Sequence, residues 1–90
     1  MLRNNMIEIK LAYYQKEDWK RFINVIVDRD SMHDTWHDWH KAFMKTKRDL
    51  INQGFEVIDI IVDLDDLIEY CKLRGLKNNG KARSQFVQAK

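Results

Sequence analysis

Proline is absent from this chain of 90 residues, and glycine occurs only three times. Since these two residues interrupt helices and strands, their scarcity predicts long regular elements joined by few tight turns. No apolar run approaches the roughly 20 residues that a membrane-spanning helix needs. The apolar run at residues 60–62 lies between Asp59 and Asp63. With 44% hydrophobic and 33% charged residues, the composition is typical of a folded domain and indicates no membrane partner.

Cysteine is also scarce, because Cys71 is the single thiol of the chain. It cannot form an internal disulfide, and a reducing cytoplasm is therefore the default location. Cys71 lies on an apolar stripe with no histidine nearby, which predicts an inert thiol in the core. Residues 1–5 lack the apolar stretch of a signal peptide. They are expected to be a loose extension, and the sequence leaves open whether Met1 or Met6 is the native start.

The net charge is only +2, from 16 Lys and Arg against 14 Asp and Glu, but the two signs are separated. Residues 55–71 hold six acids and no Lys or Arg, whereas residues 72–90 hold six bases and no acid. Asp63 and the acids after it have local roles, as a helix cap and in a first helical turn. The bases have no comparable local explanation. The C-terminal segment is therefore the leading candidate for a binding site.

Apolar periodicity predicts a single small, helix-rich α/β (α+β) domain over residues 1–90, in the order β-α-α-β-α-α. The strands are expected at residues 6–13 and 55–62, and the helices at residues 17–27, 34–53, 64–74 and 80–89. The strands are expected to be parallel, and the near-continuous apolar pattern of the second strand favours a central or two-sided position. Because two strands make a marginal sheet, either helices cover it closely or a second chain extends it. A homodimer is therefore an open alternative.

Residues 62–90 contain a helical stripe followed by a short motif. Leu64, Leu67, Tyr70 and Cys71 form the stripe, and Arg74-Gly75-Leu76, Lys77-Asn78-Asn79 and Gly80-Lys81 follow in that order. This arrangement resembles the SAP motif, a helix–extended loop–helix element of nucleic-acid-associated proteins. The sequence departs from that family at Ala82, where a second Lys is usual, and at Gln85 and Ala89, where apolar anchors are usual. Phe86 fits the remaining anchor position. Nothing in residues 1–61 shows a family resemblance.

The resemblance implies contact with nucleic acid, and the charges suggest which residues would make it: Lys72, Arg74, Lys77, Lys81 and Arg83. The start of the last helix, at Gly80 and Lys81, offers backbone N–H groups to a phosphate of DNA or RNA. No recognition helix rich in base-reading residues follows, so such contact would be non-specific. The first expectation is an accessory module that binds a nucleic-acid backbone. The alternative is a homodimeric protein–protein interaction module whose basic segment is incidental.

Two further groups of residues were weighed as sites, and neither predicts an enzyme or a cofactor. His33, His37 and His40 share one side of a helix and are weak candidates for binding zinc or nickel. Asp59, Asp63 and Asp65 flank the end of the second strand, where a magnesium-dependent hydrolase would hold its metal. No phosphate-binding glycine loop accompanies them. The tryptophans, with Phe22 and Phe43, are expected in the core because of their helical spacing.

Overall fold

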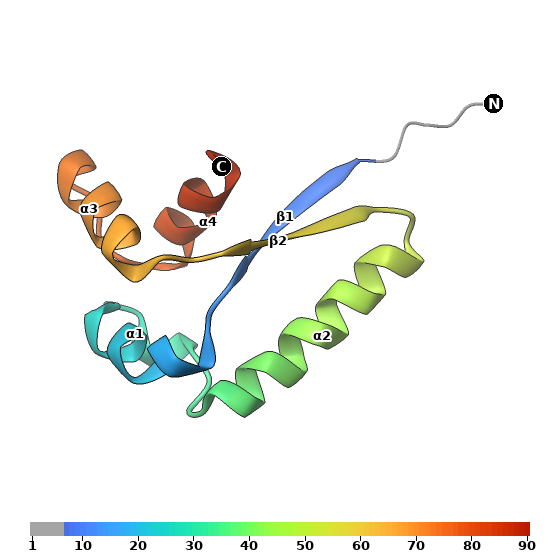
Figure 1. The fold of residues 1–90 in the computed structure, drawn as a ribbon, viewed down its shortest axis with the longest axis horizontal. Coiled ribbons are helices and arrows are strands. Elements are labelled where there is room, and N and C mark those ends of the chain that lie inside the picture. The colour runs from blue at the N-terminus through green and yellow to red at the C-terminus, as the bar shows by residue number, and fades with distance from the viewer. Residues whose placement is uncertain (1–6) are drawn as a thin grey trace.

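The computed structural model describes residues 7–90 and shows a two-stranded parallel sheet with helices on both faces (Figure 1). The prediction of a helix-rich α+β fold in the order β-α-α-β-α-α is confirmed. The strands are β1 (Glu8–Tyr13) and β2 (Glu56–Ile61). The helices are α1 (Trp19–Val25), α2 (Trp36–Asn52), α3 (Leu64–Arg74) and α4 (Gly80–Gln88), with short 3₁₀ turns at Lys16–Asp18 and Arg29–Ser31. The predictions for residues 1–5 and for the start at Met6 lie outside the described residues.

The sheet register places β1 and β2 side by side over their whole lengths, from Glu8 opposite Glu56 to Tyr13 opposite Ile61. Helix α2 covers one face, where Lys47 binds Asp59 of β2. Helix α4 packs against β1 on the other face, as Figure 1 shows. The described strands thus lie between one long helix and the C-terminal helix pair.

The helix boundaries follow from local chemistry. Thr35 caps α2 by accepting a hydrogen bond from the Asp38 N–H, and Asp63 caps α3 in the same way. The Asp63 cap confirms the sequence prediction, whereas α2 begins two residues later than Asp34. Gly54 and Gly75 follow α2 and α3 with φ of 96° and 63°, the left-handed conformation that glycine adopts most readily. Residues 26 and 27 were expected to be helical, but α1 ends at Val25.

The core is one cluster to which α1, the N-terminal half of α2, α3 and α4 all contribute, and its part beside α1 and α2 is aromatic. Tyr14 stacks on Phe22 with ring centroids 4.1 Å apart, and Trp39 packs against both Tyr13 and Phe43. The predicted burial of the tryptophans and of Cys71 is confirmed for Trp19, Trp39 and Cys71, while Trp36 is half-buried. The fully buried side chains are Phe22, Leu67 and Val62. No helix within residues 7–90 is both long enough and apolar enough to cross a membrane.

Of the two positions expected for β2, the central one is wrong, because β1 is its only neighbouring strand among the described residues. The two-sided one agrees with the helices that lie on both faces of the sheet. Ile58 and Ile60 are half-buried, but Ile61 is 62% exposed. A near-continuous apolar strand is typical of a parallel strand whose two faces are both covered. In this structure the same pattern lies at the edge of the sheet.

Candidate functional site

Helices α3 and α4 and the loop between them hold the five bases that the sequence nominates as a nucleic-acid site. Gly75 ends α3, and the Leu76 N–H then donates a hydrogen bond to the Cys71 carbonyl at 2.9 Å. Asn79 begins α4 by accepting a hydrogen bond from the Ala82 N–H at 3.0 Å. These caps confirm the predicted end of α3 and the predicted start of α4. The resemblance to the SAP motif remains a prediction.

Arg83 does not belong to an exposed basic surface, and its assignment to a nucleic-acid site is corrected here. The residue is 4% exposed, and its guanidinium forms two hydrogen bonds with the Asp28 carboxylate, at 2.8 and 2.9 Å. It also donates to the Asn78 carbonyl at 3.1 Å and lies over the Phe22 ring. A buried, bidentate pair of this kind holds a fold together and leaves the guanidinium unable to reach a phosphate. Arg83 is therefore a structural residue.

The start of α4 is already occupied by a carboxylate of the same chain. Asp28 Oδ2 accepts a hydrogen bond from the Gly80 N–H at 3.1 Å, which is the contact that a bound phosphate was expected to make. The hydrogen bond from Arg83 holds the pKa of the Asp28 carboxyl below its usual range, so this group is ionised near neutral pH. A negative charge at this position satisfies the helix dipole and repels a second anion. The expectation of a free anion site at Gly80 is therefore wrong.

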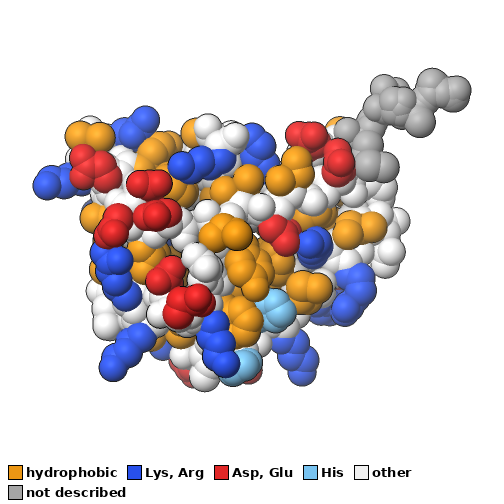
Figure 2. Space-filling model, viewed as in Figure 1, with side chains coloured by type: hydrophobic (Ala, Val, Ile, Leu, Met, Phe, Trp, Pro, Cys, Tyr) orange, Lys and Arg blue, Asp and Glu red, His pale blue; other side chains and the backbone are white. Residues whose placement is uncertain are grey.

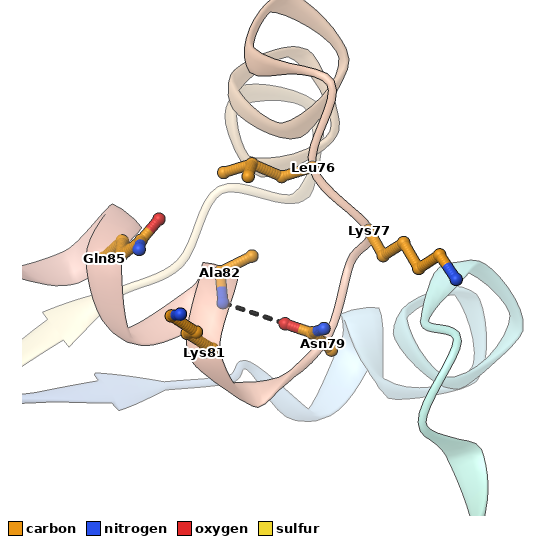
Figure 3. Close-up of a pocket in the computed structure, with 6 residues that line it drawn as sticks. All are labelled: Leu76, Lys77, Asn79, Lys81, Ala82 and Gln85. Atoms are coloured by element: carbon orange, nitrogen blue, oxygen red, sulfur yellow. Dashed lines mark hydrogen bonds between the residues drawn. The ribbon is translucent and has the colours of Figure 1, made fainter.

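The other four nominated residues remain exposed at the surface: Lys72, Arg74, Lys77 and Lys81. None of the four forms an ion pair within residues 7–90. The Arg74 guanidinium lies 3.9 Å from the centre of the Tyr70 ring. Lys77 and Lys81 border a hollow of about 140 Å³ beside Leu76 and Gln85. Figure 3 shows that the ammonium groups of these two lysines lie on opposite sides of the hollow, so the bases do not converge on one point.

The three histidines do not share one helix, because His33 precedes α2 and only His37 and His40 lie in it. Among the described residues, no three His, Cys, Asp or Glu side chains are placed to hold an ion together. His40 instead stacks on Trp36, with ring centroids 4.5 Å apart, and meets the edge of the Tyr13 ring. His33 and His37 are exposed. His40 therefore borders the aromatic core.

The three aspartates proposed for a hydrolase have separate local partners. Asp59 pairs with Lys47 at 2.9 Å, Asp63 caps α3, and Asp65 pairs with Arg21. Each carboxylate thus has a structural role, and within residues 7–90 they do not form a metal-binding group.

The sequence analysis did not identify the outer edge of β2 as a binding surface. Glu56 N–H and Val62 N–H point toward β1, where they donate to the carbonyls of Ile7 and Tyr13. Because alternate residues of a strand direct their backbone groups to opposite sides, Val57, Asp59 and Ile61 direct theirs away from β1. Within residues 7–90, no hydrogen-bond partner is present for these outward groups.

Exposed apolar side chains flank this edge. On α2, Ala42 and Thr46 line a hollow beside β1, whereas Lys47 reaches Asp59 on β2. Met44 and Ile51 lie on the same helical stripe as Lys47, at i−3 and i+4, and therefore face the β2 side. They are 40% and 51% exposed.

Figure 2 shows hydrophobic side chains gathered over the middle of one face, above the crossing strands and the N-terminal half of α2. The outer edge of β2 and this apolar border form what we call the β2 edge surface: Met44, Lys47, Ile51, Val57, Asp59 and Ile61.

Comparisons of the chain with protein-family models, with curated proteins and with solved structures found no match.

Proposed function

We propose that this protein is a protein–protein interaction module that accepts an extended strand of its partner along the outer edge of β2. The observation that carries the proposal is the set of outward backbone groups at Val57, Asp59 and Ile61, which have no partner within residues 7–90. An open strand edge is a template for another strand, because each added hydrogen bond satisfies a donor and an acceptor. Ile61 adds apolar surface at the same edge.

The opposite edge of the sheet is less open. The Lys10 carbonyl points away from β2 and accepts a hydrogen bond from the Gln88 side-chain amide at 3.1 Å. The Lys10 ammonium donates a hydrogen bond to the Gln88 carbonyl at 3.4 Å. Helix α4 thus blocks part of the β1 edge, as natural proteins do where strand pairing must be prevented. The contrast between the two edges favours β2 as the binding edge.

Amide hydrogen exchange tests the proposed edge directly. The probe is a soluble strand-forming peptide, Lys-Thr-Val-Thr-Val-Thr-Val-Lys, titrated into the full chain; the same peptide with a central proline is the control. Strand addition should slow exchange of the outward Asp59 and Ile61 amides at least tenfold and leave the Leu11 amide, already directed toward β2, unchanged. The proline peptide should have little effect, since it lacks a ladder donor. Equal exchange at Asp59 with and without the strand peptide, measured at a concentration where the chain is monomeric, would contradict the proposal.

Contact with a nucleic-acid backbone is a second candidate function. Its support is the presence of four exposed bases, Lys72, Arg74, Lys77 and Lys81, around the α3–α4 loop. The start of α4 offers fewer free N–H groups to a phosphate than the sequence suggested, because the Asp28 carboxylate already accepts a hydrogen bond from the Gly80 N–H. We therefore rank this candidate below strand binding.

A salt titration with a short DNA duplex tests this second candidate. Four neutralised phosphates predict a loss of affinity of roughly a hundredfold between about 50 and 200 mM salt. Replacing Lys72, Lys77 and Lys81 with alanine should remove most of the binding. The matched control replaces three other exposed lysines that form no ion pair within residues 7–90, Lys16, Lys20 and Lys41. If both triple variants bind equally, the duplex contact is diffuse and the candidate is excluded.

A further inference from the structure

This inference rests on the proposed strand-binding function of β2 and names the partner. We infer that the partner strand is β2 of a second copy of this chain, paired antiparallel about a twofold axis at Asp59. The product is a four-stranded sheet in the order β1-β2-β2-β1, in which two marginal sheets become one of ordinary size. The argument has three steps: the pairing of side chains, the balance of charge, and the position of α2.

The side chains of β2 are self-complementary in one antiparallel register. Outward residues must face outward residues, because each such pair exchanges two backbone hydrogen bonds. With Asp59 on the axis, Val57 of each copy faces Ile61 of the other, and Ile58 faces Ile60. Every apolar residue then meets an apolar residue, which is the arrangement that stabilises cross-strand pairs. A shift by two residues in one direction brings Val57 opposite Asp59, and in the other direction it brings Asp59 opposite Ile61.

The charges at the centre are also self-complementary. Two aspartates facing each other would repel if they were alone. In each copy, however, the Lys47 ammonium lies 2.9 Å from the Asp59 carboxylate. The twofold axis therefore brings together two acids and two bases, and each Asp59 lies between its own Lys47 and the Lys47 of the partner. A partner of a different sequence would have to present a group compatible with this ion pair, whereas a second copy presents the same pair.

Helix α2 lies on the correct side for the two copies to meet. A twofold axis perpendicular to the sheet keeps both α2 helices on the same face. The stripe that carries Met44 and Ile51 borders the β2 edge, and each of these side chains is at least 40% exposed in the single chain. In the dimer the two stripes approach each other across the new strand pair. This contact accounts for apolar side chains that have no other role within the described residues.

Disulfide trapping tests the register. In a Cys71→Ala background, Val57→Cys and Ile61→Cys proteins are prepared separately, mixed and oxidised under mild conditions. Facing residues of a hydrogen-bonded antiparallel pair have Cα atoms about 5.5 Å apart, within the range that a disulfide spans. The mixture should yield the mixed disulfide at least tenfold faster than either protein yields its own, because residues of the same number lie roughly 14 Å apart in this register. Equal rates for all three products would overturn the register.

Charge exchange gives a second and independent measurement. Asp59→Lys brings four bases together at the axis and should weaken dimerisation at least tenfold. The double variant Lys47→Glu with Asp59→Lys restores two acids and two bases, and it should recover most of the lost affinity. If both variants fold and the double variant does not regain dimer affinity, the central charge network is overturned.

The outcomes separate this inference from the function on which it rests. A chain that is monomeric at every concentration but still protects its Asp59 amide with the strand peptide overturns the second copy as partner and leaves strand binding intact. A dimer with another cross-linking pattern overturns the antiparallel pairing at Asp59. A monomer whose edge amides ignore the strand peptide overturns both.

Discussion

Replacing Asp28 with alanine is expected to lower the free energy of unfolding by about 3–5 kcal/mol, the cost of leaving one member of a buried ion pair without its partner. The Arg83 side chain would keep its charge at 5% exposure without a carboxylate partner, although the Asn78 carbonyl and side chain would still accept hydrogen bonds from it. The Gly80 N–H would lose its acceptor as well. Since a chain of this length has roughly 5–13 kcal/mol in total, such a loss approaches global unfolding at 37 °C.

Urea denaturation followed by tryptophan fluorescence measures this effect. Asp30→Ala is the matched control, because Asp30 is an exposed acid two residues away that forms no ion pair within residues 7–90; it should change stability by less than about 0.5 kcal/mol. The double variant Asp28→Ala with Arg83→Met should be more stable than Asp28→Ala alone, because the orphaned charge is removed. A loss below about 1 kcal/mol for Asp28→Ala would contradict the assigned role of the pair.

The same pair predicts a pH dependence. The pKa of Asp28 is lowered in the folded protein by the hydrogen bond from Arg83, so its contribution to stability is fully present above the ordinary carboxyl pKa of about 3.9. That contribution is lost as the pH falls through the lowered value. The Asp28→Ala protein lacks this part of the acid sensitivity, and its stability should therefore fall less steeply below pH 4 than that of the wild type.

Much of the fold could be predicted because its signals are local. The caps at Asp63 and Asn79 and the turn at Gly75 depend on residues within one helical turn. The aromatic core was also predictable, since Trp39 and Phe43 are one turn apart on a helix that must cover the sheet. These features need no knowledge of distant neighbours.

The errors concern contacts between residues far apart in the chain. Arg83 belonged to a basic segment, and only the structure shows that Asp28, 55 residues earlier, neutralises it. The same carboxylate accepts a hydrogen bond from the Gly80 N–H at the start of α4. The position of Asp28 therefore overturns both the exposed Arg83 and the free N–H at Gly80 that the sequence predicted for the nucleic-acid site. The strand β2 was misplaced for a similar reason. Its apolar pattern indicates a strand that is covered on both faces, and it does not show how many strands lie beside it.

Ile61→Lys is expected to abolish dimerisation at micromolar concentrations. A lysine on an edge strand opposes pairing, and in the twofold arrangement each substitution acts twice. Each of the two lysines in the dimer is expected to cost about 2 kcal/mol of binding free energy. The Kd should therefore rise by roughly a thousandfold. Because association stabilises the folded state, the melting temperature of the wild type should rise with protein concentration, and that of Ile61→Lys should not.

Val27→Lys is the matched control for this variant. Val27 is as exposed as Ile61, at 62%, and it lies next to the α3–α4 loop, where its backbone N–H bonds to the Asn78 carbonyl. A lysine there adds the same charge on a surface that the β2 pairing does not use. Dimerisation should be unchanged in Val27→Lys. Equal weakening by both lysines would show that net charge, rather than the edge of β2, controls association.

The molar mass of the wild-type chain in solution tests the central claim most directly. Light scattering across about 1 to 200 µM should show a mass that rises from 10.9 kDa toward twice that value, with Ile61→Lys remaining at the lower value throughout. A wild-type mass that stays at the single-chain value over the whole range would contradict the pairing of two copies through β2.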